Sequence, residues 1–395
     1  MRILFLSQLL PFPLDAGPKI RSHYVLQYLA EAGHEVKLLC FVRPMDSDHD
    51  INEVRKICSS VETLPLVRSR FKDISDGLHS FFSATPFLIL RDQVTSMERK
   101  VDQIVRGRSF VALHADQLWM APYGMKGTEP RLKVLDQHNA VFMVPRRMAE
   151  SQRNPLTRAV LRFEASKLET FERLACDLYD RVVWVTEQDR RAVGSANGHR
   201  GERSCVIPIA TDPSKISPLV RSMPFRVTFI GGMHWPPNLE GVNWFAEKVW
   251  PRVSQALPSA VLTLIGKGAP KKLCRQERMA RVEVAGYVSD LQQYLRETAV
   301  FIVPIRSGAG MRVKILDAWC WGLPVVSTSV GAEGMRTVSG DNLLIADDEG
   351  SFAENLIRVF QDHDLGRRLS GNGRATVEKF YDWRKVYQAW DQIYH

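Results

Sequence analysis

The residues best suited to chemistry lie in one short stretch, Ser307–Ala318, with the sequence SGAGMRVKILDA. Its glycines leave backbone N–H groups accessible, and the helix predicted over Val313–Trp321 points its positive end at the same loop. Arg312 and Lys314 add cations to the first turn, where the helix dipole disfavours them unless an anion lies between. Asp317 brings a carboxylate that could accept hydrogen bonds from ribose hydroxyls. The stretch therefore predicts an anion site, with an ordinary strand–turn–helix containing solvated cations as the alternative.

Three further glycine loops follow apolar runs in the same half of the chain. They are Gly231-Gly232, Gly266-Lys267-Gly268 and Gly286-Tyr287-Val288. Gly231 and Gly232 could cradle a phosphate at the helix that Asn238 opens, although a plain strand–helix turn is an equally good reading. Ligands of open α/β sheets gather at the carboxyl ends of the strands, so these loops reinforce one another.

Histidines and acids in the first half give a second set of candidates. His138 follows a short predicted strand, Leu132–Leu135, and could donate to a sugar hydroxyl or a phosphate. The stretch His114-Ala-Asp116 has a similar position and a weaker case. The acidic cluster Asp46–Asp50 resembles a divalent-cation loop but lacks glycines, which favours a solvated turn. We therefore expect no metal site.

The elements that must position these residues alternate between strand and helix. The first predicted unit is strand Arg2–Ser7, helix Ile20–Ala32 and strand Val36–Val42. A second set begins with a strand at Arg226. It continues with helix 238–250, strands Ala260–Ile265, Val282–Ala285 and Ala299–Pro304, helix Val313–Trp321 and strand Pro324–Ser327. The strands are nearly all apolar, as in parallel sheets covered on both faces. This order predicts an α/β protein with two doubly wound, Rossmann-like domains.

Proline-rich punctuation sets the expected domain boundaries. The run 208–224 contains several prolines with Ser, Thr and Asp. We expect an N-terminal domain over 1–212, a linker over 213–224 and a C-terminal domain over 225–371. A terminal helix over 372–395, with an aromatic stripe, is expected to pack across the domains.

Composition excludes several classes of protein. The 395 residues are 45% hydrophobic and 25% charged, as in an ordinary globular chain. The net charge of +9 is spread evenly, which disfavours a nucleic-acid binder. The six cysteines form no C-x-x-C pair, which suits a reducing compartment. Neither a signal sequence nor a long apolar span is found, so a cytoplasmic location is expected. The absence of G-x-G-x-x-G and of a P-loop counts against dehydrogenases and P-loop nucleotidases.

The segment VPIRSGAGMRVKILDAWCWGLPVVSTSVGAEG, which ends at Gly334, resembles the nucleotide-sugar signature of retaining GT-B glycosyltransferases of family four. The runs PFPLDAGPKIRSHYVLQYLAEAGHEV, DQHN, WVTEQD, FIGGMHWPPN, LIGKG and VEVAGYVSD occur in the same order in that group. The resemblance covers nearly the whole chain. It implies a GT-B fold and transfer of a sugar from a nucleoside-diphosphate donor to an acceptor hydroxyl with retained configuration. The C-terminal domain would bind the donor and the N-terminal domain the acceptor.

The resemblance also implies roles for individual residues. His138, Arg312 and Lys314 would be catalytic, with His138 contacting the sugar and the two cations stabilising the leaving diphosphate. The donor would be bound by Gly17, Gly231, Gly232, Gly266, Tyr287, Val288, Gly310, Met311, Arg312, Val313 and Asp317. Asp317 stands at the second acid of the family's E-x7-E pattern, where ribose binds. No cofactor or metal is implied, because cations and backbone N–H groups stabilise the developing negative charge.

The sequence departs from the family at three points. Ala309 replaces the first glutamate of E-x7-E, Asp317 is shorter than the usual glutamate, and HWPPN stands where an Arg and a Lys are common. A subgroup with a TRLKILEA-like run is similar in these respects. The departures leave two alternatives open: a nucleotide-sugar 2-epimerase of the same fold, or a non-catalytic, transferase-like scaffold.

The acceptor is expected to be a glycan, a lipid-linked molecule or a small molecule. The predicted long helix Leu156–Leu178 is accompanied by basic residues, with apolar ones nearby: Arg146, Arg147, Arg153, Arg158 and Arg162, with Phe142, Met143 and Leu156. Such a surface could give peripheral contact with the inner membrane face. Glu164, Glu169 and Glu172 make a solvated helix face an equal alternative.

Overall fold

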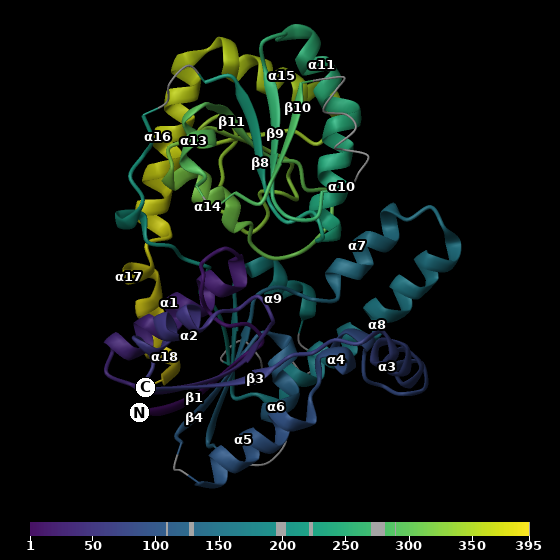
Figure 1. Cartoon of the computed structure of the whole chain (residues 1–395), viewed down its shortest axis with the longest axis vertical. Helices are drawn as coiled ribbons and strands as arrows, with labels where there is room; N and C mark the ends of the chain where they lie inside the picture. Colours follow the sequence, from purple (N-terminus) through teal and green to yellow (C-terminus); the bar gives the residue numbers. More distant parts are fainter. Residues whose placement is uncertain are drawn as a thin grey trace. The chain divides into compact units, whose positions relative to one another are not determined.

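The computed structural model describes residues 1–107, 110–125, 130–194, 203–220, 224–269, 281–288 and 290–394 (Figure 1). The chain forms two compact units. The first comprises Met1–Thr211, Ala309–Met311 and Trp383–His395, and the second comprises Asp212–Gly308 and Arg312–Asp382.

A seven-stranded sheet forms the centre of the first unit. Its strands are β1 (Arg2–Ser7), β2 (Glu35–Val42), β3 (Ser60–Pro65), β4 (Ala112–Asp116), β5 (Leu132–Gln137), β6 (Arg181–Trp184) and β7 (Ser204–Val206). They are all parallel, in the order β3-β2-β1-β4-β5-β6-β7. Strands β1 and β4 are almost completely buried. Burial fits the continuous apolar run of β1, whereas β4 carries His114 and Asp116 into the buried sheet.

The helices of the first unit are connected to these strands in order. They are α1 (Gly17–Glu31), α2 (Asp48–Arg55), α3 (Arg70–Phe82), α4 (Phe87–Asp92), α5 (Thr95–Gly107), α6 (Ala121–Met125), α7 (Met143–Ser151), α8 (Pro155–Leu178) and α9 (Glu187–Val193). The expected first strand–helix–strand unit is confirmed.

The second unit has a six-stranded parallel sheet in the order β10-β9-β8-β11-β12-β13. Its strands are β8 (Arg226–Ile230), β9 (Val261–Ile265), β10 (Val282–Gly286), β11 (Thr298–Val303), β12 (Val325–Ser327) and β13 (Leu344–Ile345). Its helices include α10 (Pro236–Trp244), α11 (Trp250–Ala256), α13 (Gln292–Arg296), α14 (Val313–Cys320), α15 (Glu349–Gln361) and α16 (His363–Phe380). In both sheets the strand order reverses direction, so the α/β class with two doubly wound, Rossmann-like units is confirmed.

Two expected helices have different boundaries in the structure. The helix expected over 238–250 becomes α10, a π-helical turn over Phe245–Val249, and α11. The expected continuous helix over 372–395 is wrong. Helix α16 begins earlier, at His363, and ends at Phe380, because Tyr381 leaves the helical conformation with φ of −135°.

After that break the chain forms short helical turns that belong to the first unit: α17 (Trp383–Val386), η5 (Tyr387–Trp390) and α18 (Asp391–Tyr394). Trp383 stacks on Tyr24 with ring centroids 5.5 Å apart, and the Tyr28 hydroxyl donates to Asp391 at 2.8 Å. The aromatic stripe that suggested a long helix is therefore buried against α1 instead.

Helix α14, which carries the predicted anion site, packs against α16. Trp319 of α14 is fully buried, and its indole Nε1 donates to the Asn342 carbonyl at 3.0 Å. Gly373 of α16 faces this ring so closely that a Cβ there would lie 2.3 Å from Trp319 Cδ1. The glycine is required for the two helices to approach each other.

We predict that Gly373→Ala destabilises the second unit by about 1–3 kcal/mol, because the buried indole cannot move away from the added methyl group. Gly371→Ala is the matched control in the same helix, since a Cβ at this exposed position meets nothing within 4 Å. The control should be neutral or stabilising by about 0.5–1 kcal/mol. Urea unfolding of both variants gives the comparison, and equal effects would contradict the packing argument.

Candidate functional site

The amino group of Lys314 occupies the end of strand β8 in the second unit. Its Nζ donates to Asn238 Oδ1 at 3.0 Å and lies 4.3 Å from the centroid of the Phe229 ring. A Cβ at Gly231 would lie 2.7 Å from the same nitrogen, so the absence of a side chain at Gly231 leaves room for the lysine. From the sequence, Gly231 is expected to help cradle a phosphate. The structure shows that this glycine and Lys314 are part of one arrangement.

Burial and like charge perturb the ionisation of this site. Burial, together with the neighbouring charge of Arg312, lowers the pKa of Lys314 to about 7. Burial raises the pKa of Asp317 to about 7, although the charge of Lys314 opposes the shift. Groups with perturbed pKa values cluster at functional sites. Lys314 and Asp317 therefore mark the start of α14 as a candidate site for a charged ligand.

The loop before α14 is shaped by glycines with positive φ. Gly308 has φ of +112° and Gly310 has φ of +80°, conformations that side chains with a Cβ rarely adopt. A Cβ at Gly308 would lie 3.0 Å from Arg312 Nη2, so the guanidinium folds back over the loop. The Ser307 hydroxyl donates to the carboxylate of Glu240 on α10. Ser307, at the start of this loop, is therefore anchored to α10 of the second unit.

The other predicted donor residues lie at the ends of neighbouring strands. Gly266 has φ of +145°, and a Cβ there would lie 2.1 Å from the Gly231 carbonyl oxygen, so β8 and β9 end in close contact. Gly232 accepts a hydrogen bond on its carbonyl from Asn238 Nδ2 at 2.8 Å. Tyr287 is exposed, and Lys267 Nζ lies 4.4 Å from its ring centroid. Val288, beside it, is half-buried.

In the first unit, strand register brings three polar side chains into one row. Ser7 pairs with Asp116 across β1 and β4, and Asp116 pairs with Asp136 across β4 and β5. All three residues are completely buried at the carboxyl ends of their strands. Two adjacent carboxylates without water need cationic or hydrogen-bonding partners.

Arg21 supplies the charge for Asp136. Its Nε donates to both carboxylate oxygens, at 2.8 and 3.0 Å, and its Nη2 donates to Oδ1 at 2.6 Å. Burial alone would raise the pKa of Asp136, but the Arg21 charge overrides it and holds the pKa well below its usual range. Asp136 is therefore an ionised, structural carboxylate.

Asp116 pairs with the predicted catalytic histidine. His138 Nε2 lies 2.8 Å from Asp116 Oδ1, while the hydroxyls of Ser7 and Ser22 donate to Asp116 Oδ2, each at 2.8 Å. Such a carboxylate fixes the orientation of the imidazole and leaves Nδ1 as the other functional nitrogen. From the sequence, Asp116 is only a weak candidate, and no sequence pattern singles out Ser22.

The buried histidine and carboxylates of this row resemble the ligands of a metal ion. One ligand atom each from His114, Asp116 and Asp136 lie within 4.8 Å of one another. However, the Arg21 guanidinium already occupies the oxygens of Asp136, and two hydroxyls donate to Asp116. Because guanidinium and hydroxyl donors hold these oxygens, the set does not fit a metal ion.

The loop that carries His138 is held by two buried acids. Glu172 on α8 accepts from the backbone N–H groups of Val141 and Phe142 at 3.1 and 3.4 Å. Asp189 accepts from the N–H of Ala140 at 2.9 Å. The expectation that Glu172 lies on a solvated helix face is wrong, because this residue is fully buried. Burial raises the pKa of its carboxyl group to about 8.

We predict that Glu172 makes stability depend on pH. The folded pKa lies above the ordinary value of 4.5, so the folded protein binds more protons than the unfolded chain between about pH 5 and 8. Stability should therefore fall as pH rises through this range. Glu172→Gln should flatten the slope, measured as melting temperature against pH, while Glu169→Gln, one helical turn away, should keep it. A slope unchanged in Glu172→Gln would refute the assignment.

The predicted site residues are divided between the two units. Gly17, His138, Gly310 and Met311 belong to the first unit, and Gly17 is the first residue of α1. The donor residues of the second unit are Gly231, Gly232, Gly266, Tyr287, Val288, Arg312, Val313 and Asp317, with Lys314. Within the second unit the structure brings Gly231, Gly266 and Lys314 together.

Two acidic groups missed or misjudged by the sequence analysis have clear local roles. Glu240 anchors Ser307, and no spacing rule connects residues so far apart in the chain. The acidic cluster Asp46–Asp50 is a helix cap: Ser47 and Asp50 form a capping box at the start of α2, as the S-x-x-D pattern allows.

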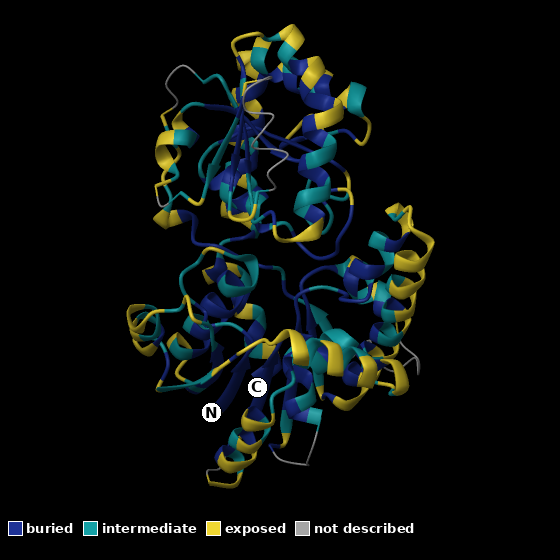
Figure 2. Ribbon diagram, turned by 45° about the vertical axis from the view of Figure 1, so that its right-hand side comes forward, coloured by how far each residue is buried: buried dark blue, intermediate teal, exposed yellow. Residues whose placement is uncertain are grey.

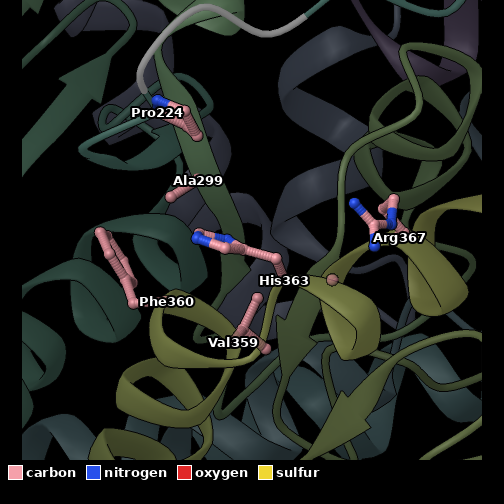
Figure 3. A pocket seen from close by; sticks show the side chains of 7 residues that line it. Pro224, Ala299, Val359, Phe360, His363 and Arg367 are labelled. Carbon is pink, nitrogen blue, oxygen red and sulfur yellow. The ribbon is translucent and has the colours of Figure 1, made fainter.

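A cavity of about 300 Å³ lies elsewhere in the second unit (Figure 3). It is lined by Pro224, Ala299, Val359, Phe360, His363, Gly366 and Arg367. Pro224 and Ala299 stand at the amino ends of β8 and β11, so this cavity lies away from the carboxyl-end loops described above. None of the predicted site residues lines it.

Two residues of the surface expected around α8 have partners within the first unit. Phe142 is fully buried, and Arg146 packs over its ring and pairs with Glu169. Among the described residues, no helix is long and apolar enough to cross a membrane.

Comparison with known proteins supports the expectation of a glycosyltransferase. Residues 224–362 match the family described as Glycosyl transferases group 1. A curated protein of Klebsiella pneumoniae, an uncharacterized 44.6 kDa protein in the cps region, is 22% identical over 98% of both chains. The lipopolysaccharide core biosynthesis glycosyltransferase LpsE of Rhizobium meliloti is 28% identical over 35% of this chain and 42% of its own.

Solved structures match over the whole chain. HepE of Anabaena, in complex with UDP and glucose, has a TM-score of 0.71 at 15% identity and covers 99% of this chain and 98% of its own. WaaG, a glycosyltransferase involved in lipopolysaccharide biosynthesis, has a TM-score of 0.66 at 14% identity over 99% of both chains. The architecture is that of the GT-B fold. Together with the family match, it supports a glycosyltransferase.

Proposed function

We propose that this protein transfers a sugar from a nucleoside-diphosphate donor to an acceptor hydroxyl with retention of anomeric configuration. The observation that carries the proposal is the arrangement at the start of α14. There, Lys314 and Arg312 stand beside glycine loops, and Asp317 follows on the same helix. Cations, backbone N–H groups and a carboxylate are the groups that a nucleoside diphosphate requires.

The reaction follows from the charge that develops on the donor. As the bond between the anomeric carbon and the diphosphate oxygen breaks, negative charge grows on the diphosphate and positive charge on the sugar. Arg312, Lys314 and the first N–H groups of α14 stabilise the leaving group. The acceptor oxygen attacks the same face and loses its proton to the departing phosphate, which retains the configuration. No protein nucleophile is required in this scheme.

The chain's own cations supply the stabilisation that a metal provides in other enzymes, so we propose a metal-independent reaction. Lys314 suits this task because its burial destabilises the ammonium until an anion arrives. Asp317 is proposed to bind the ribose hydroxyls. Burial raises the pKa of Asp317, and ribose hydroxyls that donate to this carboxylate would favour its ionised form.

We assign acceptor binding to the first unit. We propose that His138, whose imidazole is held by Asp116, is a catalytic residue that contacts the sugar. The relatives named for the cps region and for lipopolysaccharide core biosynthesis support a role in polysaccharide or glycoconjugate biosynthesis. A cytoplasmic enzyme in peripheral contact with the inner membrane face would reach a lipid-linked acceptor there.

We predict that one of UDP, GDP, ADP, CMP and dTDP raises the melting temperature without added metal. A ligand at a hundred times its dissociation constant stabilises by about 2.7 kcal/mol. Lys314→Met should lower the affinity at least tenfold, because a charge-assisted hydrogen bond contributes about 1.5–3 kcal/mol. Arg312→Ala and Asp317→Ala should weaken the shift as well.

Lys248→Met is the matched control, because Lys248 is exposed on the turn after α10 and lies outside the proposed site. This variant should keep the full shift. If no nucleotide shifts the native protein, the donor site is refuted and the non-catalytic scaffold becomes the better reading. Turnover of the matching nucleotide sugar, with the anomeric configuration of the product read by NMR, tests transfer and retention.

We predict that nucleotide binding takes up protons at pH 8 and releases protons at pH 6. At pH 8, Lys314 is mostly neutral, and an approaching diphosphate raises its pKa, so binding takes up protons. At pH 6, Lys314 is already charged and Asp317 is mostly protonated; ribose hydroxyls favour the carboxylate, so binding releases protons. Calorimetry in buffers of different ionisation enthalpy measures both quantities.

Two charge-retaining or isosteric variants separate the two groups. Lys314→Arg should bind nucleotide without proton uptake at pH 8, because a guanidinium stays charged throughout. Asp317→Asn should bind without proton release at pH 6. Proton uptake that persists in Lys314→Arg would assign the titration to another residue.

A further inference from the structure

Helix α3 of the first unit is amphipathic in the inverted sense. Its apolar residues Phe71, Ile74, Leu78, Phe81 and Phe82 fall on one side of the helix, and all five are exposed, Phe71 by 86%. A helix that packs on a protein normally buries such a stripe. The polar side of α3 faces inward instead.

Specific contacts hold α3 in this orientation. Lys72 donates to the carbonyls of Leu90 and Arg91, at 3.1 and 3.0 Å, and to Asp76 at 2.5 Å. The Ser80 hydroxyl donates to the Thr85 carbonyl at 3.0 Å. These hydrogen bonds join the polar side of α3 to α4 and to the loop before it, so turning the helix over would break them.

The first turns of α8 show the same inversion. Leu156, Val160 and Phe163, at the spacing of one helix face, are all exposed. Glu164 instead accepts from the N–H groups of Phe87 and Leu88 at 3.2 and 2.9 Å. Glu164 thus makes hydrogen bonds to α4 within the first unit, while the apolar residues of the same turns face solvent.

The two apolar stripes join into one surface. The rings of Phe81 and Phe163 lie 5.9 Å apart, and Lys167 of α8 donates to the Ser80 hydroxyl at 2.7 Å. Figure 1 shows α3 and α8 as neighbours, and the exposed colour covers much of both in Figure 2. We call Phe71, Ile74, Leu78, Phe81, Phe82, Leu156, Val160 and Phe163 the α3–α8 apolar face.

Charge around this face distinguishes its partner. Residues 151–163 contain Arg153, Arg158 and Arg162 and no acid. Arg158 and Arg162, four residues apart, share the side of α8 opposite its apolar stripe. No carboxylate among the described residues pairs with any of the three arginines. An apolar stripe with arginine on the other side is the pattern of helices that lie in a membrane interface.

We propose that the α3–α8 apolar face binds an anionic lipid surface, with the aromatic side chains at the acyl boundary and the three arginines at the lipid phosphates. A second copy of this chain packed on the apolar stripe would leave Arg158 and Arg162 on the far side of α8, without anionic partners. A helix that lies in a membrane interface has both of its sides near the lipid headgroups. Anionic lipid neutralises these arginines. The proposal rests on the proposed function only for its purpose, which is access to a lipid-linked acceptor.

The test is co-sedimentation of the full chain with vesicles of phosphatidylcholine containing phosphatidylglycerol, compared with phosphatidylcholine alone. We expect binding to the anionic vesicles and at least tenfold weaker binding to the neutral ones. Phe71→Ser with Leu78→Ser, and separately Leu156→Ser with Val160→Ser, should each reduce binding at least tenfold. Arg158→Gln with Arg162→Gln should remove the preference for anionic lipid.

Val338→Ser, an exposed apolar residue of the second unit, is the matched control and should bind as the native chain does. Native binding by both apolar double variants, or no binding by the native chain, overturns the proposal. So does an oligomer that these variants convert to a monomer, since a second copy would then cover the face. The nucleotide-induced thermal shift of the same variants tests the donor site separately and should not change.

Discussion

The first unit depends on the buried ion pair between Arg21 and Asp136. Arg21 comes from α1 and Asp136 from β5, and Arg21 also donates to the carbonyls of Ile207 and Pro208. Its guanidinium lies 5.5 Å from the Trp390 ring centroid, so the C-terminal turns pack on the same group. Breaking such a pair typically costs about 3–5 kcal/mol, because one charge stays buried alone. One side chain thus joins four segments that are far apart in the sequence.

The paired charges of the first unit contrast with the site at the start of α14. Asp136 is ionised and its charge is compensated by Arg21, so its carboxylate has a structural role. Lys314 and Asp317 are instead held near their titration points. Groups whose pKa values are perturbed cluster at functional sites, whereas a carboxylate that already has a cationic partner offers less to a charged ligand. The same physics therefore separates structural charges from the proposed functional ones.

The strands and the glycine loops could be read from the sequence because they depend on local properties. Continuous apolar runs give buried parallel strands, and glycines after β8 and β9 mark turns that a Cβ would block. The helix over 372–395 could not be read in this way. Its aromatic stripe has helical spacing, but the chain leaves the helix at Tyr381 because Trp383 and its neighbours pack on α1. Tertiary packing overrode the local pattern.

The sequence by itself determined the α/β architecture and the group of residues on α14, since both follow from periodicity and from the chemistry of neighbouring residues. Only the tertiary structure decided which charges are satisfied. It paired Asp116 with His138, gave Glu172 to a buried loop, and turned the apolar side of α3 toward solvent. The physical reason is that ionisation and exposure depend on what surrounds a side chain in space, and those neighbours come from distant parts of the chain.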